Sequence, residues 1–169
     1  MKWKVYLLLL LIASTAQAQD VFLQEERIRK ETRVLYDAAD AQCPEQFKYG
    51  SNLNATQEFW TVCNLGGGDR IIKIEWYKHE SLNSFTFREI YFEKAGDLIY
   101  AKESEDFYMK NQLEAKSWNC EFFTQNGDLL TTMSLGHGKT EMEDWDPEVI
   151  FEMYQGRLTE LEKLKIAND

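Results

Sequence analysis

The chain has 169 residues, of which 44% are hydrophobic, 14% aromatic and 28% charged. It contains only 2 prolines and 9 glycines, which excludes collagen-like, low-complexity and disordered chains. Its formal net charge of −10 argues against a nucleic-acid-binding protein, because an acidic chain repels phosphate. We therefore expect one acidic globular domain with no nucleic acid among its partners.

The segment 1–18 has the pattern of a secretory signal peptide. Two lysines precede a continuous apolar run over residues 5–13, and small side chains follow at Ala16 and Ala18. The run is shorter than the roughly 20 apolar residues that a membrane-spanning helix needs. We expect cleavage after Ala18, a single α+β domain over residues 19–169, and a soluble periplasmic or secreted product without a membrane span.

All three cysteines, Cys43, Cys63 and Cys120, follow this segment. In an oxidising compartment we expect one pair to form a disulfide bond and one thiol to be left over, and the spacing does not choose among the three pairings. The alternative is that all three are small buried apolar side chains. Because the chain has no CxxC motif and no Cys/His cluster, we expect no bound metal, and no motif indicates a cofactor.

Two segments have helical periodicity. Residues 21–42 contain no glycine, and one narrow apolar stripe predicts a helix that lies on a core rather than inside one. Residues 146–166 begin with Asp146 as a cap and Pro147 in the first turn, which predicts a second helix. The stripe of the first helix consists of Val21, Ile28, Leu35 and Ala39. The apolar face of the second consists of Ile150, Met153, Tyr154, Leu158, Leu161 and Leu164.

Between the helices, short runs of aromatic and β-branched residues alternate with turn signals, as in an antiparallel meander. The clearest turn signal is the Asn126-Gly127 pair, which is typical of a tight hairpin. One sheet face is the only large surface that both helices could cover. The sequence therefore predicts an α+β fold, an antiparallel β-meander of about six strands with an N-terminal and a C-terminal helix packed on one face. The expected strands are 57–64, 69–79, 84–93, 97–104, 115–124 and 128–135.

Two of the expected hairpins, 91–99 and 122–130, have similar sequences. Each has two aromatic residues, three loop residues, Gly-Asp and two aliphatic residues. These hairpins and the Ala16-Gln17-Ala18-Gln19-Asp20 junction resemble small secreted proteins of Bacteroidota, most of them of unknown function. The hairpins are also similar to MORN-like antitoxin-type repeats, although the repeat length and the number of repeats differ. The resemblance implies a meander, no activity and no catalytic residue.

Aromatic side chains are more numerous in the expected strands than one buried face requires. The third expected strand carries bulky residues on both faces, so some rings should remain on the face that the helices leave uncovered. A ligand or peptide site there would use Tyr77, Phe85, Phe87 and Tyr91. The alternatives are that residues 44–56 fold over these rings as a loop, that the rings mix with charges at the surface, or that the face mediates self-association.

Residues suited to catalysis are few. His137, between two glycines and near Ser134, could act as a general base, but the chain lacks a nucleophile-elbow motif. The acidic run at 141–148 lacks the spacing of a calcium loop, and we expect it to cap the second helix while Trp145 contacts the sheet.

The sequence thus favours a secreted or periplasmic, non-enzymatic binding module over an enzyme. Its partner would be a small molecule or a peptide or protein of the cell envelope, bound at the aromatic sheet face. A hydrolase-like enzyme that uses His137 and a structural envelope-associated protein are the alternatives. The residues indicate neither the identity of the ligand nor the oligomeric state.

Overall fold

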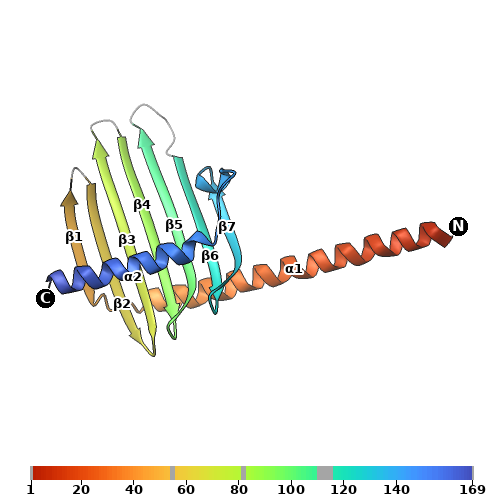
Figure 1. Cartoon of the computed structure of the whole chain (residues 1–169), viewed down its shortest axis with the longest axis horizontal. Coiled ribbons are helices and arrows are strands. Elements are labelled where there is room, and N and C mark those ends of the chain that lie inside the picture. Colours follow the sequence, from red (N-terminus) through yellow and green to blue (C-terminus); the bar gives the residue numbers. More distant parts are fainter. Residues whose placement is uncertain (1, 54–55, 81–82, 110–115, 169) are drawn as a thin grey trace.

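The computed structural model describes residues 2–53, 56–80, 83–109 and 116–168. A seven-stranded antiparallel sheet lies between two helices, α1 (Lys2–Asp40) and α2 (Val149–Asn168), and a short 3₁₀ helix, η1 (Lys139–Glu141), precedes α2 (Figure 1). Every strand pairs with its neighbours in sequence, so the sheet order is β1 to β7. The strands are β1 (Phe47–Leu53), β2 (Thr56–Gly66), β3 (Asp69–Glu80), β4 (Asn83–Lys94), β5 (Asp97–Met109), β6 (Lys116–Gln125) and β7 (Asp128–Gly136).

The predicted α+β meander is confirmed, with seven strands in place of about six. The additional strand is β1, which lies in the segment expected as a loop over residues 44–56 and pairs with β2 at the edge of the sheet. Its Phe47 and Tyr49 contact the core, but the second half of the strand is Gly-Ser-Asn-Leu. Glycine, serine and asparagine have low strand propensity, and this explains why the sequence pattern did not reveal the strand.

Three tight hairpins share the same backbone geometry, which explains the similar sequences of 91–99 and 122–130. In each, the two central residues have positive φ, as a type I′ turn requires, and a register shift lies beside the turn in the ladder. The turn pairs are Gly67-Gly68, Ala95-Gly96 and Asn126-Gly127. The similar sequences therefore encode one kind of hairpin made twice.

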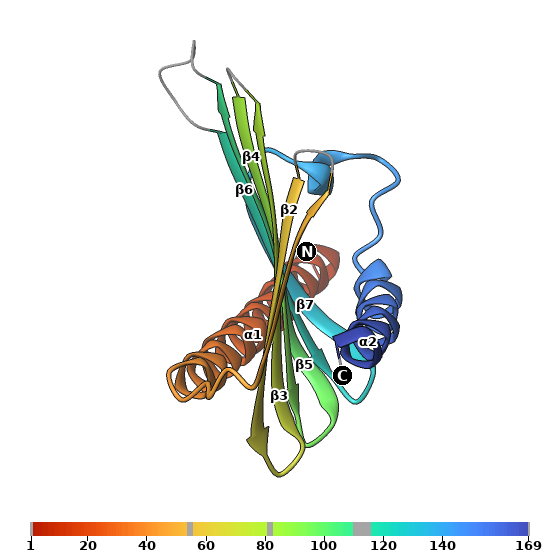
Figure 2. The same ribbon diagram turned by 90° about the vertical axis from the view of Figure 1, so that its left-hand side faces the viewer.

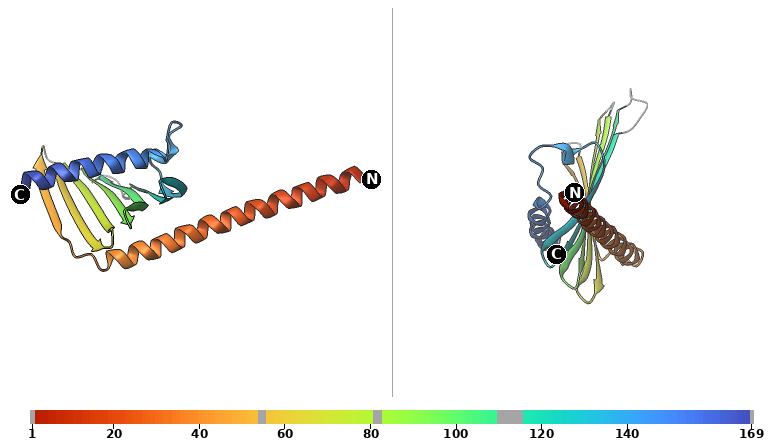
Figure 3. Two further views of the ribbon diagram at one scale, coloured as in Figure 1. Left: turned by 60° about the horizontal axis from the view of Figure 1, so that its bottom comes forward. Right: turned by 90° about the vertical axis from the view of Figure 1, so that its right-hand side faces the viewer.

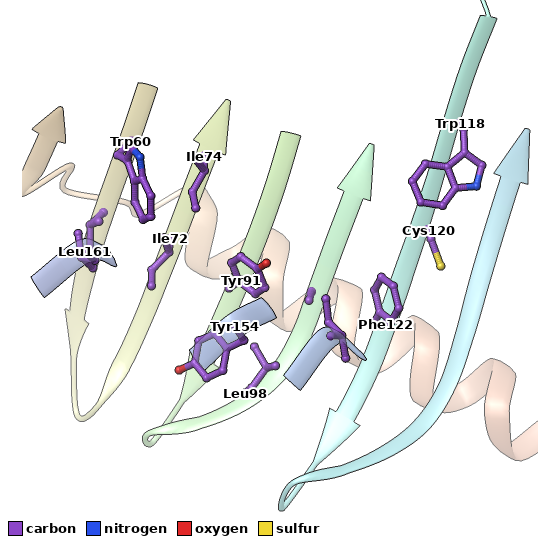
Figure 4. Packing of buried hydrophobic residues seen from close by; sticks show 13 residues of the cluster. Trp60, Ile72, Ile74, Tyr91, Leu98, Trp118, Cys120, Phe122, Tyr154 and Leu161 are labelled. Atoms are coloured by element: carbon purple, nitrogen blue, oxygen red, sulfur yellow. The ribbon is translucent and has the colours of Figure 1, made fainter. Parts of the chain in front are cut away.

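The prediction that both helices pack on one face of the sheet is wrong: α1 covers one face and α2 the other (Figure 2). The side chains Ile150, Tyr154 and Leu161 of α2 join one apolar cluster of the sheet, and α1 contributes to a second cluster on the opposite face. Figure 4 shows the first cluster on the strands, with α1 behind the sheet. Because the central strands carry large apolar residues on both faces, each face needs its own cover.

Helix α1 uses half of the stripe that its apolar spacing predicts, Ile28 and Ala39, and adds Tyr36. Ile28, Tyr36 and Ala39 pack against the sheet, whereas Val21 and Leu35 are exposed. Polar contacts complete the attachment of α1, so the side of this helix that faces the sheet is less apolar than its sequence pattern predicts.

One disulfide bond and one free thiol are present, as expected. Cys43, just after α1, is bonded to Cys63 in β2, with 5.3 Å between the Cα atoms, and Cys120 is free and buried. The disulfide fastens the end of α1 to its own face of the sheet. Among the described residues, no helix has the combination of length and apolar character that a membrane crossing requires.

Candidate functional site

The four residues expected to share one uncovered face do not lie together. Phe85, Phe87 and Tyr91 belong to the face that α2 covers, whereas Tyr77 belongs to the α1 face. The register gives the reason: Trp76 is the partner of Phe87, so Tyr77, one residue further along, points to the other side. Tyr91 is only 1% exposed, inside the core beneath α2. The expected arrangement is therefore wrong, while a role of these residues in binding is not tested by their positions.

A group of rings nevertheless remains at the end of the sheet that α2 does not cross. Two rows of paired residues run across strands β3 to β6 there. Their aromatic rings are partly buried, except Trp118, which is fully buried. We call the four rings Trp76, Phe85, Phe87 and Phe107 the aromatic end. The outer row is Lys78, Phe85, Phe107 and Lys116, and the inner row is Trp76, Phe87, Glu105 and Trp118.

The inner row of the aromatic end is fixed by contacts with its neighbours. The rings of Trp76 and Phe87 lie 5.5 Å apart, and the guanidinium of Arg157 in α2 lies 4.7 Å from the centre of the Trp76 ring. The outer row ends in an exposed lysine on each side. The outer row therefore presents two adjacent rings with a lysine at each end, while the inner row contains the carboxylate of Glu105.

Next to the aromatic end, two glutamates are buried opposite each other, Glu89 on β4 and Glu103 on β5. Glu89 accepts hydrogen bonds from Nε and Nη2 of Arg157, at 2.6 and 2.9 Å, and from the hydroxyl of Tyr91, at 2.9 Å. The hydrogen bonds to Glu89 raise the pKa of Arg157, and burial together with this carboxylate raises the pKa of Tyr91. Both groups therefore keep their protons, and the Glu89–Arg157 ion pair joins α2 to the middle of the sheet.

Glu103 is less well satisfied than Glu89. Lys139 of η1 donates a hydrogen bond to Oε1, while Oε2 is buried without a hydrogen-bond partner. Burial raises the pKa of the Glu103 carboxyl. The hydrogen bond from Lys139 lowers this pKa, whereas the negative charge of Glu89 raises it further. A carboxylate in this position costs free energy, which the bonded Lys139 and the more distant charge of Arg157 offset only in part.

Cys120 is the partner of Glu103 on the next strand and is fully buried. Figure 4 shows it on β6 between Trp118 and Phe122. Burial, with a contribution from the charge of Glu103, raises the pKa of its thiol to about 12. The reactive form of cysteine is the thiolate, so this side chain behaves as a small apolar residue and not as a nucleophile.

His137 lies at the surface in the segment between β7 and η1. Its Nδ1 is 2.7 Å from a carboxylate oxygen of Glu141, and the ring is otherwise open to solvent. The glycines on either side have a packing role: a Cβ atom at Gly138 would lie 2.3 Å from the indole of Trp118, and one at Gly136 would lie 2.1 Å from the carbonyl oxygen of Ser117. The Gly-His-Gly sequence is thus explained by the close passage of the chain over Trp118.

The acidic run before α2 has the structure that its sequence predicts. A carboxylate oxygen of Asp146 accepts a hydrogen bond from the backbone N–H of Glu148 at 2.9 Å, which starts the turn into α2. Trp145 packs on Phe122 of the sheet with 6.4 Å between the rings. Among the described side chains, no group of three or more histidine, cysteine, aspartate or glutamate residues is placed to hold a metal ion.

On the opposite face, α1 is attached through a polar cluster. Arg33 forms an ion pair with Glu121 of β6, whose carboxylate also accepts a hydrogen bond of 2.7 Å from the hydroxyl of Tyr100. Burial acts to raise the pKa of Glu121, but the hydrogen bonds from Arg33 and Tyr100 outweigh it, so the pKa is lowered. Further along this face Arg88 bridges Glu75 and Asp106, so the side of the sheet behind the aromatic end is polar.

Comparisons of the chain with protein-family models, with curated proteins and with solved structures found no match. The residues that sequence reasoning missed are Arg157, Glu89 and Glu103. A signal for Arg157 was present, because it follows Tyr154 by three positions and precedes Leu161 by four, in the middle of the buried stripe of α2.

Proposed function

We propose that this chain is an exported, non-enzymatic binding module whose aromatic end holds an apolar ligand or peptide that carries a negative charge. The observation that carries the proposal is the outer row, in which two phenylalanines on neighbouring strands lie between two exposed lysines. Of the residues expected as contacts, Phe85 and Phe87 remain in this proposal. Trp76 and Phe107 take the places of Tyr77 and Tyr91.

The chemistry of the row suits such a ligand. Partly buried rings on adjacent strands present a continuous apolar surface, and binding would remove this surface from water. Lys78 and Lys116 would attract a carboxylate or sulfonate at either end of the ligand. Because the rings project from a paired sheet and Trp76 is held by Phe87 and Arg157, little side-chain freedom would be lost on binding.

Export of the chain is part of the same proposal. The signal-peptide pattern of residues 1–18 and the Cys43–Cys63 disulfide both support an oxidising compartment outside the cytoplasm. The intact mass of the purified product tests this directly. The mass of a chain that begins at Gln19 supports export, and the mass of a chain that keeps residues 1–18 contradicts it.

The binding proposal is tested with 8-anilinonaphthalene-1-sulfonate, an apolar fluorophore with one negative charge, and with short aromatic peptides that carry a carboxylate. We expect a probe at 100 times its dissociation constant to raise the melting temperature by roughly 5–10 °C, because ligation then stabilises the fold by about 2.7 kcal/mol. Phe85→Ser should abolish this rise. Phe59→Ser, at an exposed ring on the α1 face, is the matched control and should preserve it. An equal loss in both variants, or no rise with any probe, would refute the proposal.

A further inference from the structure

Helix α1 does not end where the sheet ends. It runs past β7, the last strand, so that its first part lies beyond the edge of the sheet (Figure 3). Two large apolar side chains of α1 that line a hollow beside β7 are exposed, Phe22 to 59% and Val34 to 60%. Large apolar residues that lie close together and are exposed to solvent are typical of an interaction surface.

The hollow, of about 570 Å³, lies between α1 and β7. Arg29 and Arg33 line it but are already engaged, with Thr131 and Glu121 respectively, and Met133 of β7 also contributes to the wall. The rest of the lining belongs to one row of α1 in which the residues are four positions apart and therefore lie above one another on one ridge of the helix. This row, which we call the α1 ridge, is Phe22, Glu26, Lys30 and Val34.

The α1 ridge is complementary to its own reversed copy. Read in either direction it has an apolar residue at each end and two opposite charges between them. If a second ridge runs antiparallel to the first, Phe22 faces Val34 and Glu26 faces Lys30, and each pairing occurs twice about a two-fold axis. Glu26 and Lys30 are exposed, and neither has an ion-pair partner among the described residues.

We propose that the occupant of this hollow is α1 of a second copy of the chain, so that the protein forms a two-fold dimer through antiparallel α1 ridges. The complementary charges fix the direction and register of the two helices, and the exposed Phe22 and Val34 are buried.

The test compares the mass of the protein in solution for charge variants of the ridge. The chain is expressed from its full sequence, purified as the cell processes it, and measured by sedimentation equilibrium over a range of concentrations. Glu26→Lys and Lys30→Glu should each weaken the dimer by roughly tenfold or more, because each places like charges opposite each other twice. Glu162→Lys makes the same change of charge at an exposed position of α2, on the other face of the sheet, and is the matched control.

Two combinations separate this register from a general effect of charge. The double variant Glu26→Lys/Lys30→Glu restores opposite charges and should regain the dimer. An equimolar mixture of the two single variants should form a mixed dimer, since every Glu26–Lys30 position then pairs opposite charges. A wild-type chain that is monomeric at all concentrations, single variants that dimerise like the wild type, or a mixture that stays monomeric would overturn the proposal.

Discussion

Two glutamates that face each other in the sheet, Glu89 and Glu103, should differ strongly in the effect of the same substitution on stability. Glu89→Gln removes the negative charge that holds Arg157, whose side chain is 27% exposed. The amide keeps one acceptor oxygen, so one of the two hydrogen bonds from Arg157 is lost and a partly buried guanidinium is left without its anion. Breaking a buried ion pair on one side typically costs about 3–5 kcal/mol. Because Arg157 keeps Glu160 and some solvent, we expect about 3 kcal/mol.

Glu103→Gln should cost at most about 1 kcal/mol or stabilise the protein. One carboxylate oxygen of Glu103 has no hydrogen-bond partner, and the pKa of this group is raised mainly by burial. Its cation, Lys139, is one-third exposed and can turn to water when the charge is removed. A neutral amide of the same shape therefore avoids most of the desolvation cost that the carboxylate carries.

Urea unfolding at pH 7, followed by tryptophan fluorescence, measures both effects. For an m-value of about 2 kcal/mol per molar, Glu89→Gln should lower the midpoint by roughly 1.5 M, whereas Glu103→Gln should leave it nearly unchanged or raise it. Glu89→Gln combined with Arg157→Met should recover part of the loss, because no unpaired charge is left. An equal or larger loss in Glu103→Gln would refute this reasoning.

Three further predictions follow from other contacts. Glu121→Gln should lower the free energy of unfolding at neutral pH, because the pKa of Glu121 in the folded wild type is lowered. The ionised carboxylate stabilises the wild type above the ordinary carboxyl pKa, and this stabilisation disappears as the pH falls through the lowered pKa. Unfolding of wild type and variant at a series of acidic pH values measures the difference. Reduction of the Cys43–Cys63 bond, whose cysteines are 20 residues apart, should lower the free energy of unfolding by about 3 kcal/mol. Dithiothreitol should therefore lower the melting temperature of the wild type, but not that of the Cys43→Ser/Cys63→Ser variant. Gly138→Ala should lower the melting temperature by several degrees because of its contact with an indole, whereas His137→Ala, at a solvent-exposed position, should change it little; similar losses would contradict these assignments.

The elements of the sheet were predictable because local chemistry determines them. Alternating aromatic and β-branched residues and positive-φ turn pairs such as Asn126-Gly127 place six of the seven strands within a few residues. The placement of the helices was not predictable in the same way. Which face each helix covers depends on pairing between strands, and only the register shows that Trp76 and Phe87 share a face while Tyr77 does not.

The candidate site was harder to predict because its main members are polar residues in apolar positions. Periodicity assigns Arg157 and Glu103 to solvent unless each is given a partner, and their partners, Glu89 and Lys139, are 68 and 36 residues away in sequence. The aromatic end likewise depends on where α2 stops covering the sheet, which is a tertiary property. The abundance of rings on both faces of β4 was the one signal that pointed toward this surface.

The central claim is that the aromatic end is where the protein makes contact with its ligand. An NMR map of chemical-shift changes in the folded chain, recorded during titration with 8-anilinonaphthalene-1-sulfonate, measures this most directly. We expect the largest changes at Trp76, Phe85, Phe87 and Phe107 and at the two flanking lysines, Lys78 and Lys116. Changes concentrated on the α1 face around Phe59 and Arg88, or spread evenly over the sheet, would contradict it.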